Sequence, residues 1–216
     1  MVIRRLRDGF SRILQQSPND LYRSVRYSQD GQKVASGGHQ GGIMVSNVRT
    51  GKRLASYMGH VHHVCGLVFT PDGKGLVSAS WDKIVIHWDV SWLESTYDNQ
   101  EEDVSTQDSA GGLSELFRFV GHEVFQFKSV LPAPHSHTLF KDFVYAISIS
   151  PDGSWIASGS SDNTVRIWNA HTAALQCILH GHEYVRSVDF SRSGDYLAVG
   201  NGNGKVTVWN FTKLLE

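Results

Sequence analysis

Short runs of alternating apolar and polar residues, each bounded by turn-forming residues, occupy most of this 216-residue chain. In the clearest stretch, residues 143–150 alternate, Pro151-Asp152-Gly153 turns the chain, and residues 156–160 run back. Ser161-Asp162-Asn163 makes a second turn into residues 165–168, and a fourth run follows. Alternation with period two predicts β-strands, and turns at such short intervals predict antiparallel hairpins in series. The pattern therefore predicts sheets of four antiparallel strands.

The arrangement recurs about every 40 residues, as the spacing of Trp168 and Trp209 illustrates. A weaker copy spans 21–47 and has Ser46 where the tryptophan belongs. Repetition at this period predicts a series of similar small sheets rather than one large sheet. Three copies begin with a Gly-His pair and end their third run with a Trp-Asp or Trp-Asn pair. The histidine and tryptophan of these pairs are His60 and Trp88, His122 and Trp168, and His182 and Trp209.

The Gly-His pairs, the Ser-x-x-x-Asp turns and the Trp-Asp pairs resemble the WD40-repeat family, and the resemblance covers nearly the whole chain. It implies an all-β fold: a partial or truncated WD40 β-propeller of about four blades, each of four antiparallel strands. We expect a basic lead-in with a possible closing strand over residues 1–19, followed by the propeller over 20–216. The blades are expected at about 20–58, 59–120, 121–180 and 181–216.

A closer resemblance is to the C-terminal propeller of the fungal Tup/Groucho-type general transcriptional co-repressors. It is carried by Gly59-His60, by the segment 69–77, and by Trp88-Asp-Val-Ser91 before a polar insert. Residues 20–25 and 176–182 resemble an early blade and the penultimate blade. The resemblance implies a scaffold for transcriptional repression that binds other proteins or short peptide segments, without direct contact to nucleic acid or membrane. The alternatives are a generic WD40 adaptor, such as a signalling or substrate-receptor scaffold, and a truncated propeller fragment without function.

The second and third copies bring together histidine, serine and aspartate, the residue types of a hydrolase triad. Because the set recurs with the repeat, we interpret it as a buried hydrogen-bond network and expect no catalytic residue and no cofactor. The first copy keeps only Ser36, which predicts a looser first blade. The predicted network residues are His60, Ser78, Asp82 and Trp88 in the second copy, His122, Ser158, Asp162 and Trp168 in the third, and His182 and Trp209 in the fourth.

Two inserts interrupt the repeat, at about 94–112 and 124–141. The first is acidic and has no Lys or Arg, which predicts a disordered loop, either a spacer or a docking tail for a basic partner. Removal of the second would join Glu123 to Asp142 and restore the period. It is either a loop on the face that carries the His and Asp turns or a translated intron, since the codons of valine and lysine suit splice boundaries.

The ends of the chain bear on how the propeller closes. Co-repressor propellers of the type that the chain resembles have seven blades, whereas this chain has about four, and the last stops after its third strand. Pairing of residues 11–16 with 206–209 would complete that blade. An open arc would instead expose an apolar face and unpaired strand edges, which favour association. A homodimer that forms an eight-bladed ring and a truncated product are two open hypotheses.

A partner is expected on the face that carries the Gly-His loops and the Asp turns. Two positions in each blade point outward there, the second residue after the histidine and the residue before the aspartate. They are His62, Trp81, Ser161 and Tyr184. Large aromatic side chains on exposed turns are typical interface anchors, although Trp81 has the alternative of packing on its own blade. No metal site is expected, because the clustered histidines lack Cys or carboxylate partners at ligand spacing.

Composition narrows the class further. Twenty basic and 21 acidic residues give a formal charge of −1, which argues against wholesale binding to nucleic acid or an anionic membrane. No apolar run is long enough to span a bilayer. Cys65 and Cys177 form no CxxC pair, which favours reduced thiols and a nuclear or cytoplasmic location. The arginine-rich start faintly resembles a mitochondrial presequence, but a basic strand or helix is the preferred interpretation.

Overall fold

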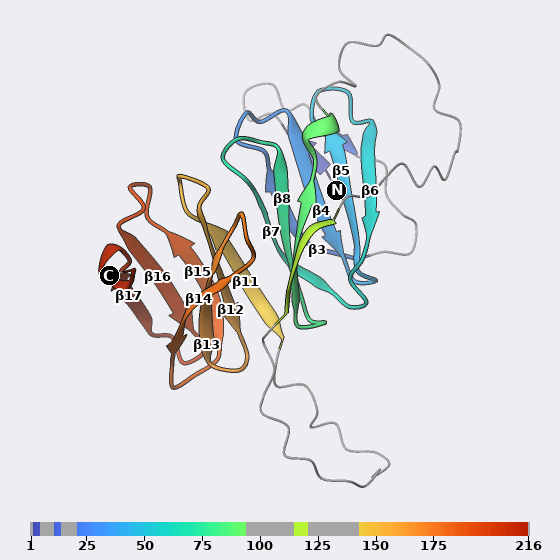
Figure 1. Cartoon of the computed structure of the whole chain (residues 1–216). Coiled ribbons are helices and arrows are strands. Elements are labelled where there is room, and N and C mark those ends of the chain that lie inside the picture. Colours follow the sequence, from blue (N-terminus) through green and yellow to red (C-terminus); the bar gives the residue numbers. More distant parts are fainter. Residues whose placement is uncertain (1, 5–10, 14–20, 94–114, 121–142, 216) are drawn as a thin grey trace, which may run out of the picture.

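Four antiparallel β-sheets, one for each sequence repeat, make up most of the protein (Figure 1). The computed structural model describes residues 2–4, 11–13, 21–93, 115–120 and 143–215. We call the four sheets the first to fourth blades. The first contains β3 (Tyr22–Tyr27), β4 (Lys33–Gly38), β5 (Gly42–Asn47) and β6 (Arg53–Met58). The second contains β7 (Val64–Phe69), β8 (Gly75–Ser80), β9 (Ile84–Asp89) and β10 (Glu115–Val120). The third contains β11 (Val144–Ile149), β12 (Trp155–Ser160), β13 (Thr164–Asn169) and β14 (Leu175–His180). The fourth contains β15 (Val185–Phe190), β16 (Tyr196–Asn201) and β17 (Val206–Asn210), and the 3₁₀ helix η2 (Thr212–Leu214) follows it.

Strands follow chain order within each blade, and each blade packs against the next through its first strand. These inner strands, β3, β7, β11 and β15, lie side by side along the assembly. The first and fourth blades lie at opposite ends of the row, so the propeller is an open arc (Figure 1). The prediction of an all-β, partial propeller with about four blades of antiparallel strands is confirmed.

A side-chain hydrogen bond shapes the turn between the first two strands in each of the first three blades. In the second blade, Asp72 Oδ1 accepts from the Thr70 hydroxyl and from the backbone N–H two residues further on. Gly73 takes a φ of 71°, which residues with a Cβ rarely adopt. Asp30 and Asp152 make the same bonds in the first and third blades. The Asp-Gly pair therefore fixes where each inner strand reverses.

Apolar side chains are buried mainly between neighbouring blades, in three clusters. Close approach of the blades depends on small residues: a Cβ added to Gly159 would lie 2.4 Å from Val185 Cγ1 of the next blade. The cores thus fix the blades relative to one another. Representative buried members are Ile43 and Leu67 at the first interface, Val77 and Ile156 at the second, and Ile167 and Leu197 at the third.

The fourth blade ends the arc with three described strands, and its outer strand β17 exposes Val206 (71%) and Val208 (62%). The strand β2 (Ser11–Ile13) pairs with β1 (Val2–Arg4) and not with β17. The expected pairing of residues 11–16 with 206–209 is therefore wrong for the described part of that segment. Pairing of β2 with β1, its neighbour in the sequence, costs less loop-closure entropy than pairing with the distant β17. Residues 14–16 and both inserts, 94–112 and 124–141, lie outside the described residues.

Candidate functional site

His60, Ser78, Asp82 and Trp88 form a chain of hydrogen bonds in the second blade. His60 Nδ1 lies 2.8 Å from Asp82 Oδ2, and His60 Nε2 lies 2.7 Å from Ser78 Oγ. Trp88 Nε1 donates to the same hydroxyl oxygen over 2.8 Å. The side chains come from the loop before β7, from β8, from the β8–β9 turn and from β9, so the chain of bonds links all of these elements.

The burial and charge of these four residues show whether they form a structural network or an accessible nucleophile. Burial disfavours an ionised Asp82, but the hydrogen bonds from His60 and from two backbone N–H groups outweigh it and hold the Asp82 pKa below its ordinary value. An ionised Asp82 keeps the His60 proton on Nδ1, so that Nε2 accepts from the Ser78 hydroxyl. Ser78 is 0% exposed, and its oxygen already receives the Trp88 N–H. The geometry favours a network that holds the blade together over a nucleophile that a substrate can reach.

The third blade contains part of the same network. Trp168 Nε1 donates to Ser158 Oγ over 2.8 Å. Asp162 accepts from the backbone and the hydroxyl of Thr164 within its own turn. His122 lies outside the described residues.

The fourth and first blades lack most of the network. His182 is exposed and Trp209 is half-buried, and neither makes a side-chain hydrogen bond within the described part of the chain. In the first blade, Ser36 Oγ reaches a backbone carbonyl of β5 at 3.5 Å. Ser46, in the tryptophan position, has a buried hydroxyl with no partner among the described residues. These two blades therefore depend more on apolar packing.

The inner strand of every blade is irregular at its second residue. The antiparallel register shifts there in β3, β7, β11 and β15. A bulge leaves one residue out of the ladder and redirects its side chain. The residues at these shifts are Arg23, Cys65, Tyr145 and Arg186. All four lie at the end of the blades that carries the His and Asp turns.

Arginine and aromatic side chains connect this end of the arc from blade to blade. The Arg23 guanidinium lies 4.8 Å from the Trp81 ring centre, and Trp81 stacks on Phe143 at 4.7 Å. Tyr145 meets Trp81 edge-on at 6.1 Å. Arg186 lies over the Tyr145 ring at 4.8 Å. The contacts are cation–π and aromatic pairs, and they run from the first blade to the fourth.

Two of the four predicted partner residues belong to this surface. Trp81 is half-buried between Arg23 and Phe143 rather than on its own rim, and Tyr184 lies 5.1 Å from Arg186. We define the aromatic–arginine row as Arg23, Trp81, Phe143, Tyr145, Arg186 and Tyr184.

The other two predicted residues differ from each other. His62 lies beside the row, 5.7 Å from the Trp81 ring, and burial together with the neighbouring His63 holds the His62 pKa below its ordinary value. Ser161 is half-buried, and its Oγ accepts the Phe143 N–H at 2.7 Å. This hydrogen bond positions a member of the row.

Four members of the row, Arg23, Phe143, Tyr145 and Arg186, were not predicted. A signal for three of them exists in the sequence. When the inner strands are aligned, Arg23, Tyr145 and Arg186 occupy the same second position. Phe143 occupies no such equivalent position. It belongs to the row because its ring stacks on Trp81 of the preceding blade.

Other kinds of site are not formed by the described residues. Among them, no three His, Cys, Asp or Glu side chains lie close enough to hold a metal ion. Cys65 and Cys177 are free thiols, and burial raises the pKa of Cys65 to about 11. None of the described helices has the length and apolar character needed to cross a membrane.

Comparison with known proteins identifies the repeat. The family model described as "WD domain, G-beta repeat" matches residues 51–89, 115–169 and 174–210, which is more than half of the chain. In the solved structure of a mitotic checkpoint complex, one chain superimposes with a TM-score of 0.75 at 21% identity, covering 98% of this chain and 55% of that one. At this identity the likeness concerns the fold.

Curated relatives differ in role. The pre-rRNA-processing protein IPI3 of Mycosarcoma maydis is 27% identical over 156 residues, 70% of this chain and 23% of that protein. The transcriptional repressor rco-1 of Neurospora crassa is 40% identical over 43 residues, 20% of this chain and 7% of that protein. The chain thus spans less than a quarter of the length of either relative.

Proposed function

The chain belongs to the WD40 family, whose members typically act as protein-interaction scaffolds, and we propose that it holds a partner peptide along the aromatic–arginine row. The observation that carries the proposal is continuity. Contacts from Arg23 to Arg186 join side chains of all four blades into one surface. Rigid aromatic rings and arginines are the residue types that dominate interface energies. We propose no catalytic activity for this surface.

The charge of the row indicates the chemistry of the partner. Arg23 and Arg186 bring two guanidinium groups over aromatic rings. The nearby acids Asp82 and Asp162 are turned into their own blades, with side-chain exposures of 3% and 6%. An extended segment that carries carboxylates beside apolar or aromatic side chains would complement this surface in both charge and shape.

The finer proposal is a role related to transcriptional co-repression in the nucleus. The match to the repressor rco-1 supports it over a short stretch, in agreement with the residues of the second blade that resemble Tup/Groucho-type co-repressors. A general adaptor role is the alternative, because a relative named for pre-rRNA processing matches more of the chain. Binding of acidic peptides is expected in either role.

A fluorescein-labelled peptide library that alternates Asp or Glu with Leu, Phe or Trp tests the proposal. Fluorescence anisotropy should show saturable binding, and Arg186→Ala should weaken it about tenfold, the size expected for a charge-assisted contact. Arg192→Ala is the matched control, because Arg192 is exposed in the β15–β16 turn at the other end of the same blade. Equal effects of the two substitutions, or binding retained when Gln and Asn replace every acid, would contradict the proposal.

A second proposal concerns self-association of the open arc. Val206 and Val208 are exposed, and the outer edge of β17 pairs with no further strand among the described residues. Both features favour a homodimer in which a second copy covers this edge. Light scattering on the eluting protein should then give twice the chain mass of 24.0 kDa. A monodisperse monomer would refute it, and a broad, aggregating profile would support the alternative of a propeller fragment without independent function.

A further inference from the structure

Two positions, one on the second strand and one on the third strand of each blade, hold different residue types at the three blade interfaces. The first residue of the second strand in each blade faces the next blade, and it is Lys33, Gly75 and Trp155 in the first three blades. Lys33 is only 2% exposed, and Trp155 packs on Phe211 with ring centres 6.3 Å apart. The first and third interfaces are thus filled at this position by a large side chain. Only glycine stands at the second interface.

The second position of the pair lies diagonally across from the first on the neighbouring strand, two residues before the residue that pairs with it. It holds Val45 and Ile167 in the first and third blades, but His87 in the second. The His87 ring lies directly over Gly75: a Cβ there would be 2.3 Å from His87 Nε2. Glycine is therefore required for the imidazole to take this place.

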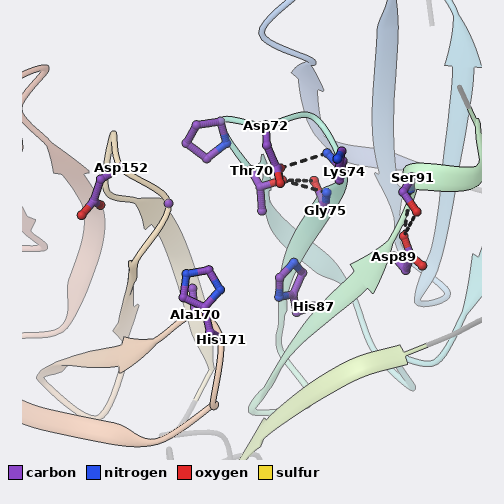
Figure 2. A pocket seen from close by; sticks show the side chains of 12 residues that line it. Thr70, Asp72, Lys74, Gly75, His87, Asp89, Ser91, Asp152, Ala170 and His171 are labelled. Atoms are coloured by element: carbon purple, nitrogen blue, oxygen red, sulfur yellow. Dashed lines mark hydrogen bonds between the residues drawn. The ribbon is translucent and has the colours of Figure 1, made fainter.

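Together these two changes open a pocket of about 420 Å³ between the second and third blades. It opens on the side of the β7–β8 and β11–β12 turns, at the opposite end of the blades from the aromatic–arginine row. Figure 2 shows His87 and His171 on facing sides of the pocket, with Asp72 and Asp89 on the second blade. Its volume is within the range of ligand-binding pockets.

The charges around the pocket are mostly negative. Asp72, Asp89 and Asp152 line it, against Lys74 as the cation among the lining residues. Hydrogen bonds in the turn occupy Asp72 Oδ1, and Asp72 is exposed. Burial holds the pKa of His87 below its ordinary value, although a hydrogen bond to the Ala170 backbone and the charges of Asp72 and Asp89 act to raise it. The imidazole is therefore neutral near pH 7, and one of its nitrogens can accept a hydrogen bond.

We propose that this pocket binds the side chain of a lysine from a partner protein. The first interface provides the precedent within the same molecule, because it holds the stem of Lys33 buried beside the carboxylate of Asp30. In the second interface the aliphatic stem would enter beside the His87 ring that covers Gly75, between Pro71 of the second blade and Ala170 of the third. The ammonium group would then reach the carboxylates at the rim, as amphipathic basic side chains generally do.

The proposal is independent of peptide binding to the aromatic–arginine row. It adds a second contact surface, with a preference for a cationic residue where the row prefers an acidic segment. A partner that engages both would have to extend from one end of the blades to the other.

Nuclear magnetic resonance of the histidine C–H signals provides the test on the full chain. The probe is the blocked pentapeptide acetyl-Gly-Ser-Lys-Ser-Gly-amide, and the matched peptides carry norleucine or tryptophan in place of lysine. The lysine peptide should shift the His87 and His171 signals saturably, and the norleucine peptide should not. Asp72→Asn should weaken the binding about threefold, as expected of an exposed ion pair.

A filled pocket is the second arm of the experiment. The double variant Gly75→Trp with His87→Ile reproduces the pair Trp155 and Ile167 of the next blade, and it should abolish the lysine-dependent shift of His171. Circular dichroism checks that the variant is folded, and the comparison of peptides on the unaltered protein needs no variant. Equal binding of the norleucine or tryptophan peptide, or a shift of His171 that persists in a folded double variant, would overturn the proposal.

Discussion

Replacement of Ser78 by alanine removes the central atom of the network in the second blade. Ser78 Oγ is 2.7 Å from His60 Nε2 and 2.8 Å from Trp88 Nε1, and it is completely buried. The substitution leaves one ring nitrogen and one indole N–H without a partner in a place that water does not reach. The volume removed is small, so the loss of these two hydrogen bonds dominates the cost.

The magnitude follows from the number of orphaned groups. A buried polar group that loses its partner costs about 1–3 kcal/mol. Two such groups sum to about 2–6 kcal/mol, and local relaxation favours the lower half, so we expect Ser78→Ala to lower the free energy of unfolding by about 3 kcal/mol. Ser36→Ala is the matched control in the first blade. Ser36 is equally buried but makes one long bond of 3.5 Å, so its loss should cost less than about 1 kcal/mol.

Urea unfolding followed by circular dichroism at 25 °C measures both variants. With a slope of about 2 kcal/mol/M, the Ser78 variant should unfold roughly 1 M earlier than the Ser36 variant. In a Trp88→Phe background, Ser78→Ala should cost about 1 kcal/mol less, because one of the orphaned groups is already absent. Equal losses for Ser78→Ala and Ser36→Ala, with unchanged slopes, would refute the reasoning.

Asp82 has a folded pKa below its ordinary value of 3.8, so its stabilising contribution is present above pH 3.8 and is lost as the pH falls through the folded value; Asp82→Asn should flatten the dependence of the urea midpoint on pH between pH 5 and pH 3. His87 has a folded pKa below 6.5, so protonation favours the unfolded chain and stability falls as the pH drops below 6.5; His87→Ile should reduce this fall in the same titration, and an unchanged slope would contradict it. Gly159→Ala places a Cβ 2.4 Å from Val185 Cγ1 and should cost about 1–3 kcal/mol in thermal or urea unfolding. With a pKa of about 11, Cys65 should react with iodoacetamide far more slowly at pH 8 than free cysteine does, as mass spectrometry of the labelled protein can show.

Local patterns were sufficient to predict the strands and the candidates for the network. The alternation and the Asp-Gly turns lie within a few residues of each other, and each turn is closed by its own aspartate, as Asp72 and Asp152 illustrate. The contacts of His60, Ser78, Asp82 and Trp88 lie within one blade, so the repeat alone brings them together. The structure adds their distances.

Contacts between blades were harder to predict. Trp81 looked like a side chain on its own turn, but its position depends on Arg23 of the preceding blade and Phe143 of the following one. The pocket beside His87 likewise depends on what the third blade places opposite it. A single repeat contains no information on such pairs. They emerge when the same position is compared across repeats and the order of the blades is known.

The irregular second residue of each inner strand has a consequence for redesign. Arg23, Cys65, Tyr145 and Arg186 stand out of the hydrogen-bond ladders, and the apolar interfaces between the blades are built from other residues. On the proposed role of the aromatic–arginine row, a combinatorial library that varies these four positions would alter binding at this end of the blades and leave the apolar interfaces unchanged. The arc in this respect resembles an antibody framework, with one variable position in each blade.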